Sequence, residues 1–125
     1  MPAPSPVRTL WRMLVLNRFI IPPDTQDGFV ARAHAALAAL ADRPGYLSGR
    51  LTRALDDPAY WTLVTEWESV GAYRRALGGF DVKVHATPLL SESVDEPSAY
   101  ETLAAADPGG QVVVTDSDRA AEPWR

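Results

Sequence analysis

Hydrophobic and polar residues follow two periods in the first third of the chain, and each period predicts one element. Residues 12–20 are rich in aliphatic and aromatic side chains, which is typical of a strand. Pro22-Pro23 end it, because proline cannot donate to a strand ladder. A helix then runs from Asp24 or Thr25, either of which can cap it, to about Asp42. Its apolar residues recur at helical spacing and are Phe29, Ala33, Ala36, Leu37 and Leu40.

The remaining pattern predicts strands, turns and two further helices. Pro44-Gly45 is a turn, and Ser69 can cap a helix from Val70 to Leu77 that Gly78-Gly79 end. The other expected elements are strands at about 46–55, 59–67 and 98–105, a turn at 56–58, a short helix at about 81–87, a turn at 107–110 and a possible short strand at 111–115.

This β-α-β-β-α-β order predicts an α+β fold of the ferredoxin-like kind. Both faces of the first strand are mostly apolar, so both need a cover. The helices cover one face, and a second copy of the sheet covers the other in a two-fold homodimer. The alternative is a monomer with a locally apolar surface. We expect an N-terminal arm at 1–10, a main domain at 11–106 and a C-terminal tail at 107–125 that contains the possible short strand.

Composition narrows the classes of function. A chain of 125 residues is one domain, and its net charge of −4 without a basic run argues against nucleic acid as a partner. The chain contains no cysteine, which excludes disulfides and thiol catalysis. Its apolar runs are far shorter than the roughly 20 residues of a membrane span. The N-terminus lacks the apolar core of a signal peptide, so we expect no membrane partner and a cytoplasmic protein.

Two polar residues stand out as candidates for chemistry. His85 lies beside Val82 and Ala86, so its helix is at least half buried, and a semi-buried imidazole can act as an acid, a base or a metal ligand. Asn17 lies in an apolar strand, on the face that alternation turns toward the helices. Its amide either satisfies a backbone group at a bulge or donates to a ligand in a pocket. His34, by contrast, lies off the apolar stripe of its helix and fits a surface residue.

Aromatic residues are concentrated around the third strand. Trp61, Trp67, Tyr60 and Tyr73 supply a wide aromatic surface, which is usually core and dimer interface. Trp67 shares a strand face with Leu63 and Trp61, so a place in the core is the expectation for it.

Several of these residues together resemble the antibiotic biosynthesis monooxygenase superfamily of small dimeric α+β barrels. The resemblance rests on Asn17, on Pro44-Gly45-Tyr46-Leu47, on Val64-Thr65-Glu66-Trp67-Glu68-Ser69 with Ala72-Tyr73, and on His85. It covers about residues 12–106. It implies the dimeric barrel and an oxidoreductase of the monooxygenase type.

The superfamily has a haem-degrading branch, which this chain most resembles, and a cofactor-free branch. In the haem branch an asparagine and a histidine at the positions of Asn17 and His85 flank the haem, and the histidine ligates iron. A helix tryptophan of that branch is replaced by Ala76, and a pocket phenylalanine by Ala33. Haem binding through His85 therefore stays possible, whereas haem degradation is not expected.

Cofactor-free oxygenation of an electron-rich aromatic or quinol-type molecule is therefore the function that we expect, with no metal or other cofactor. The expected catalytic residues are Asn17 and His85, in a pocket between the sheet and the helices. The residues expected to line the substrate are Phe19, Phe29, Ala33, Trp67 and Ala76. A non-catalytic dimer that binds a small ligand is the further alternative, because one amide and one imidazole serve either role.

Overall fold

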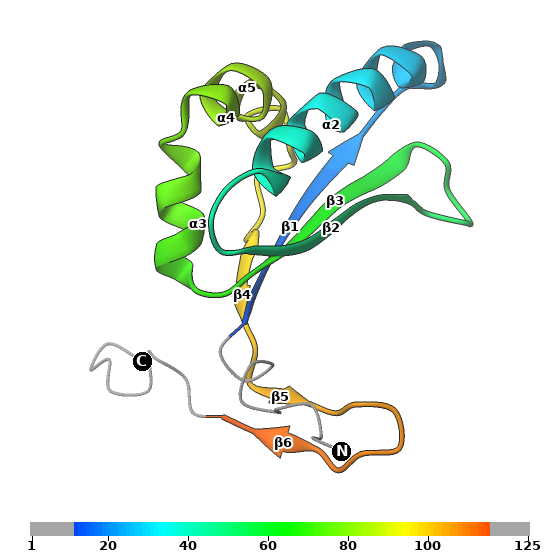
Figure 1. The fold of residues 1–125 in the computed structure, drawn as a ribbon. Coiled ribbons are helices and arrows are strands. Elements are labelled where there is room, and N and C mark those ends of the chain that lie inside the picture. Colours follow the sequence, from blue (N-terminus) through cyan, green and yellow to red (C-terminus); the bar gives the residue numbers. More distant parts are fainter. Residues whose placement is uncertain (1–11, 116–125) are drawn as a thin grey trace.

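A computed structural model describes residues 12–115 of the chain (Figure 1). The elements are β1 (Met13–Ile20), the 3-10 turn η1 (Pro23–Thr25), α2 (Gln26–Ala41), β2 (Tyr46–Arg53), β3 (Tyr60–Trp67), α3 (Val70–Leu77), α4 (Phe80–His85), α5 (Thr87–Leu90), β4 (Ala99–Glu101), β5 (Ala104–Ala105) and β6 (Val113–Val114). The expected arm at 1–10 and the end of the expected tail lie outside the described residues.

The main sheet is antiparallel and has the strand order β2-β3-β1-β4. With α2 between β1 and β2, and α3 to α5 between β3 and β4, this is the ferredoxin-like α+β arrangement, so the predicted fold class is confirmed. All eight residues of β1 pair with β3, from Met13 opposite Trp67 to Ile20 opposite Tyr60. β1 thus lies in the middle of the sheet, where its side chains are best shielded.

Alternation along β1 divides the sheet into a helix-facing side and an open face. Met13, Val15, Asn17 and Phe19 are buried beneath the helices, as predicted. Leu14, Leu16, Arg18 and Ile20 lie on the other side and are half-buried or exposed. We call that second side the open face; its other residues are Ser48, Arg50 and Thr52 of β2, Tyr60, Thr62, Val64 and Glu66 of β3, and Tyr100 of β4.

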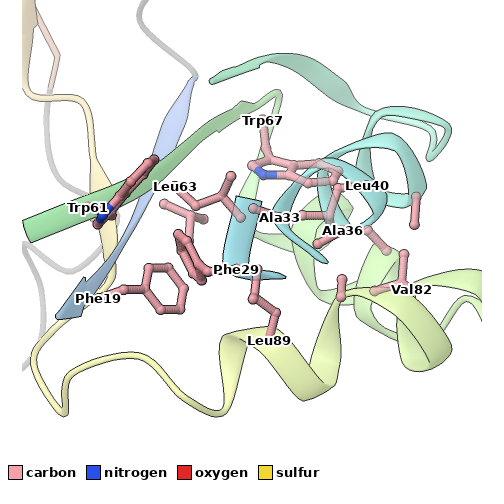
Figure 2. Packing of buried hydrophobic residues seen from close by; sticks show 14 of the residues in the cluster. Phe19, Phe29, Ala33, Ala36, Leu40, Trp61, Leu63, Trp67, Val82 and Leu89 are labelled. Carbon is pink, nitrogen blue, oxygen red and sulfur yellow. The ribbon is translucent and has the colours of Figure 1, made fainter. Parts of the chain in front are cut away.

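The core lies between the helix-facing side and α2 to α5 (Figure 2). The predicted apolar stripe of the first helix supplies its centre, because Phe29, Ala33, Ala36 and Leu40 are all buried. His34, as predicted, is exposed on the opposite side of the same helix. None of the helices between residues 12 and 115 is long and apolar enough to cross a membrane.

The turn after α2 fixes the end of β3 and the start of α3. Gly45 has a φ of 89°, and a Cβ atom there would collide with that of Ala72. Its carbonyl accepts a hydrogen bond of 2.9 Å from the Glu68 amide, just after β3. Ser69 then caps α3 as predicted, since its hydroxyl oxygen accepts from the Ala72 amide at 3.0 Å.

The structure differs from the sequence prediction in three local features. Thr25 does not cap α2 with its side chain; its hydroxyl donates to the Pro22 carbonyl at 3.0 Å instead. The single helix expected at 81–87 is two short helices, α4 and α5, with Pro88 in the first turn of the second. The strand expected at 98–105 ends at Glu101, and the chain beyond it pairs with residues 113–114 rather than with β1.

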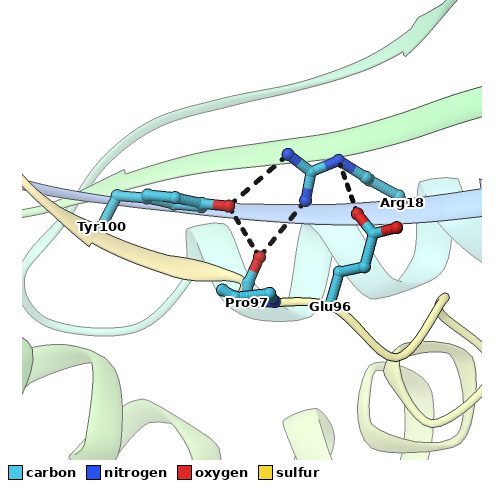
Figure 3. Close-up of polar contacts among 4 residues, drawn as sticks. All are labelled: Arg18, Glu96, Pro97 and Tyr100. Atoms are coloured by element: carbon cyan, nitrogen blue, oxygen red, sulfur yellow. Dashed lines mark hydrogen bonds and ion pairs between the residues drawn. The ribbon is translucent and has the colours of Figure 1, made fainter.

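Arg18 holds the segment before β4 against the open face (Figure 3). Its guanidinium lies 3.6 Å from a carboxylate oxygen of Glu96 and donates to the Pro97 carbonyl at 3.2 Å and to the Tyr100 hydroxyl at 3.5 Å. The Tyr100 hydroxyl in turn donates to the Pro97 carbonyl at 2.8 Å. These contacts set the position of the strand from which the rest of the described chain leaves the sheet.

Candidate functional site

Asn17 is the polar residue that the fold places on the helix-facing side of the central strand. Its side chain is 8% exposed and lies between those of Val15 and Phe19 along β1, with Leu63 opposite on β3. Among the described residues its amide makes no hydrogen bond. The interpretation in which Asn17 satisfies a backbone group at a bulge is therefore wrong. A buried amide without a protein partner is free to bind a ligand or a water molecule.

An aromatic cluster lies next to Asn17 at the end of the sheet. The ring centroids of Phe19 and Phe29 are 5.1 Å apart, and those of Phe29 and Trp61 are 5.4 Å apart in an edge-on contact (Figure 2). The guanidinium of Arg53 covers the Trp61 ring at 5.2 Å from its centroid. Phe19 and Phe29, both expected at the pocket, therefore belong to one packed group.

Trp61 carries a polar atom that the sequence analysis did not single out. Its side chain is 8% exposed, and its indole Nε1 is buried without a hydrogen-bond partner. Trp61 pairs with Phe19 across the ladder, so it is the diagonal neighbour of Asn17 on the same side of the sheet. No sequence pattern marks an unpartnered indole, since any buried tryptophan gives the same aromatic signal.

Trp67, in contrast, has its polar atom satisfied. It is 0% exposed, and its indole nitrogen donates to the Thr65 hydroxyl at 2.8 Å. The rings of Tyr46 and Tyr73 pack against it at 5.3 and 5.5 Å. Burial raises the pKa of both tyrosine phenols above the ordinary value of 10.0, so both stay neutral near pH 7. The expectation that Trp67 belongs to the core is confirmed, and its contact with substrate stays a prediction.

Ala33 and Ala76 are both buried, at 0% and 2% exposure, on the core sides of α2 and α3. Figure 2 shows Ala33 in the same packed layer as Trp67, Leu63 and Leu40. Their small side chains therefore let the helices pack on the sheet. Their role as substrate-lining residues stays a prediction.

His85 does not lie in a semi-buried position, and that expectation is wrong. In α4 the core-facing residue is Val82, whereas His85 is exposed. It borders an open surface depression of about 450 Å³ between α2 and α4. The other residues of this depression are Ala35, Ala38, Ala39, Asp42 and Asp81, which include none of the other predicted pocket residues.

His85 and Asn17 are consequently on different sides of α2. Asn17 lies on the sheet side beneath the buried row of α2, and His85 lies beside the flank that carries Ala35 and Ala38. A joint site of the two residues stays a prediction, and this placement does not support it.

Haem does not fit the described residues around His85. An imidazole could ligate iron, but a haem face needs an apolar and enclosed pocket. The depression at His85 is open, its apolar lining is alanine, and Asp42 and Asp81 would repel the haem propionates. No group of histidine, aspartate and glutamate side chains within residues 12–115 could hold a metal ion.

An antiparallel sheet in the order β2-β3-β1-β4, covered on one side by helices, defines an α+β protein of the ferredoxin-like class. Comparison with known sequences makes the assignment narrower: the profile of the antibiotic biosynthesis monooxygenase family matches residues 12–85. The chain belongs to this family, as the sequence motifs indicated.

Individual relatives agree with this assignment. A crystal structure of SnoaB, a cofactor-independent oxygenase from Streptomyces nogalater, is 27% identical, with a TM-score of 0.56 over 73% of this chain and 92% of that one. A conserved protein from Methanosarcina mazei Go1 has a TM-score of 0.65 at 18% identity, over 76% of this chain and 96% of that one, and shows the fold alone.

Protein SchA from Streptomyces halstedii is 34% identical over an aligned length of 56 residues, and the match covers 42% of this chain. The match spans only about 15% of the length of SchA. It relates a segment of the two proteins and not their whole activities.

Proposed function

We propose that this protein catalyses the cofactor-free oxygenation of an electron-rich aromatic or quinol-type small molecule. Membership of the monooxygenase family supports the reaction class, and the similarity to SnoaB, a cofactor-independent oxygenase, supports the absence of a cofactor. The single observation that carries the proposal is the Asn17 amide, which is buried on the helix-facing side without a protein partner.

Such a reaction requires few catalytic groups from the protein. An electron-rich phenol becomes reactive toward oxygen once it loses a proton, because the anion can give an electron to O₂. An anthrone-type methylene and one O₂ then give one carbonyl and one water, so that atoms and electrons balance. The protein must bind the anion away from water and stabilise its negative oxygen.

Asn17 suits the stabilising role. The amide N–H donates to the oxygen of the bound phenolate, and this hydrogen bond strengthens as negative charge develops there. The neighbouring aromatic cluster of Phe19, Phe29 and Trp61 supplies rings against which a planar substrate can stack. The Asn17 carboxamide remains neutral throughout and does not accept the phenol proton. That proton goes to solvent or to a basic group of the substrate itself.

Oxygen consumption with a panel of hydroquinones and anthrone-type phenols tests the proposal. Asn17→Leu keeps the branched outline of the side chain and removes the donor, and should lower kcat/KM about 10- to 100-fold, the value of a hydrogen bond to a charged group. His85→Ala is the matched control and should retain turnover, because His85 is exposed on the far flank of α2.

Three outcomes would contradict the proposal. Silence across the panel, with tight binding of the same compounds, would favour a non-catalytic binding protein. Turnover that survives Asn17→Leu but is lost in His85→Ala would move the chemistry to the surface depression. If titration with haemin instead gave a sharp one-to-one transition in the Soret band that His85→Ala abolishes, that result would favour haem binding.

A further inference from the structure

The helix-facing side of the sheet carries two polar groups without protein partners, and these two are diagonal neighbours. Asn17 pairs with Leu63 across the ladder between β1 and β3. The next pair on the same side is Phe19 with Trp61. The Cα atoms of diagonal neighbours in an antiparallel pair are about 7–8 Å apart. The side chains of Asn17 and Trp61 leave the sheet on one side, so they can contact one bound molecule together.

The indole of Trp61 lacks an acceptor because the sequence places none beside it. Trp67, in the same strand, donates to Thr65, which lies two residues earlier on the same side. The residues two positions from Trp61 are Ala59 and Leu63, and neither has an acceptor in its side chain. The Nε1 atom of Trp61 is consequently buried and unpaired. An unpaired buried donor costs free energy, and an acceptor on a bound molecule removes that cost.

Two contacts hold the Trp61 ring in one orientation. The guanidinium of Arg53 lies over the ring at 5.2 Å from its centroid. The Phe29 ring meets it in an edge-on contact, with 5.4 Å between the centroids (Figure 2). The indole N–H lies in the plane of its ring, so it points past the rim of the ring and not at either face. A planar ligand can therefore meet this N–H with one of its edges.

Solvent reaches the two polar residues more than it reaches the apolar residues next to them. Asn17 and Trp61 are each 8% exposed, whereas Phe19, Phe29 and Leu63 are at most 1% exposed. The polar diagonal thus borders the part of the core that is reached from outside. A ligand that arrives there meets two donors without an acceptor and an otherwise apolar surface, which is the usual lining of a small-molecule site.

We propose that the Trp61 indole is a second substrate-binding donor, and that Trp61 and Asn17 together select a planar aromatic molecule with two oxygens on one edge. The class of ligand rests on the proposed function. Asn17 donates to the oxygen that becomes the anion, and Trp61 donates to a neighbouring hydroxyl or carbonyl oxygen of the same ring system. Two hydrogen bonds from a rigid strand fix the orientation of the ring system, which one bond leaves free to turn. Trp61 therefore determines which oxygenated aromatic molecules fit.

Two isomeric quinones that consume no oxygen test the proposal by binding alone. In 1,8-dihydroxyanthraquinone both hydroxyls lie beside one carbonyl, on the same edge of the ring system. In 2,6-dihydroxyanthraquinone the same groups lie at opposite corners, so each edge presents one carbonyl oxygen. Equilibrium dialysis at neutral pH gives both dissociation constants. The wild type should bind the first isomer about 5- to 10-fold more tightly, which is the value of one additional hydrogen bond.

Trp61→Phe keeps an aromatic ring and removes the N–H. It should weaken the binding of the first isomer about 5- to 10-fold and leave that of the second unchanged, so that the preference disappears. The second isomer is the matched control, because lost packing would weaken both isomers alike. Nuclear magnetic resonance of the indole N–H groups of the wild type is independent of the variant. One indole signal should move to lower field with the first isomer and stay in place with the second.

Failure of this inference can be told from failure of the proposed function. Equal affinity of the wild type for the two isomers, no binding of either, or an equal loss of both in Trp61→Phe would overturn the inference and make Trp61 a packing residue. Oxygen consumption that depends on Asn17, without a preference between the isomers, would leave the proposed function standing alone. A preference that depends on Trp61, without oxygen consumption by any phenol of the panel, would support the two-donor site and refute the oxygenase.

Discussion

The hydrogen bond between Trp67 and Thr65 allows a quantitative test of the core. Thr65→Val keeps the shape of the side chain and removes the hydroxyl that accepts from the Trp67 indole N–H. The indole nitrogen lies 2.8 Å from that hydroxyl oxygen, and Trp67 is 0% exposed. A buried donor left unpaired costs about 1–3 kcal/mol. The rings of Tyr46 and Tyr73 enclose Trp67, so the indole cannot turn to reach water.

Urea unfolding, followed by the fluorescence of the tryptophans, measures this cost. The free energy of unfolding of Thr65→Val should fall by that amount, and the melting temperature by about 4 °C per kcal/mol for a chain of 125 residues. Thr52→Val is the control, because Thr52 is exposed and contacts Thr62 only at the surface; it should change the stability by less than about 0.5 kcal/mol. A stable Thr65→Val variant would refute the reasoning. The reasoning would also be refuted if Thr65→Val lowered the free energy of unfolding equally in a Trp67→Phe background, which has no indole N–H to leave unpaired.

Two further predictions concern the turn after α2 and the buried phenols. Gly45→Ala should lower the free energy of unfolding by at least about 1–2 kcal/mol, since the backbone there is left-handed and a Cβ atom meets Ala72; Gly28→Ala, with free space around it in α2, should be neutral or stabilising in the same urea titration. Burial raises the pKa of Tyr73, so the folded state keeps its proton while the unfolded state loses it above pH 10. The contribution of Tyr73 to stability should therefore be constant below pH 10 and fall above it, and Tyr73→Phe should reduce the fall in stability there; an equal fall in both proteins would assign it to other groups.

Sequence patterns predicted the fold well where one side chain decides the local structure. The alternation from Met13 to Phe19 determined which side of β1 meets the helices, and Ser69 determined where α3 begins. Both signals are local, because a strand alternates at every residue and a cap needs only the amide three residues ahead. The predicted length of the strand at 98–105 was wrong for the opposite reason, because the continuation of a strand depends on a distant partner. Ala104 and Ala105 pair with residues 113–114 instead of with β1.

The prediction for His85 failed on helical geometry. Val82 and Ala86 are four residues apart, so they share one face of the turn, and that face is buried. His85 precedes Ala86 by one residue and is therefore rotated by about 100° from it, onto the exposed side. Consecutive residues of a helix therefore do not share an environment. Asn17 could be placed correctly because residues two apart in a strand point to the same side of the sheet.

The unpartnered amide of Asn17 also has a consequence for stability. A buried polar group without a hydrogen bond costs about 1–3 kcal/mol, and the nearest strand positions on this side, Val15, Phe19 and Leu63, are apolar. Asn17→Leu should therefore raise the free energy of unfolding by about 1–2 kcal/mol while it lowers turnover, which is the trade-off expected of a site that ligand binding alone satisfies. Asn17→Leu in urea unfolding, without ligand, measures the first effect. A destabilised variant would mean that the amide is held by an ordered water and belongs to the framework of the fold rather than to its site.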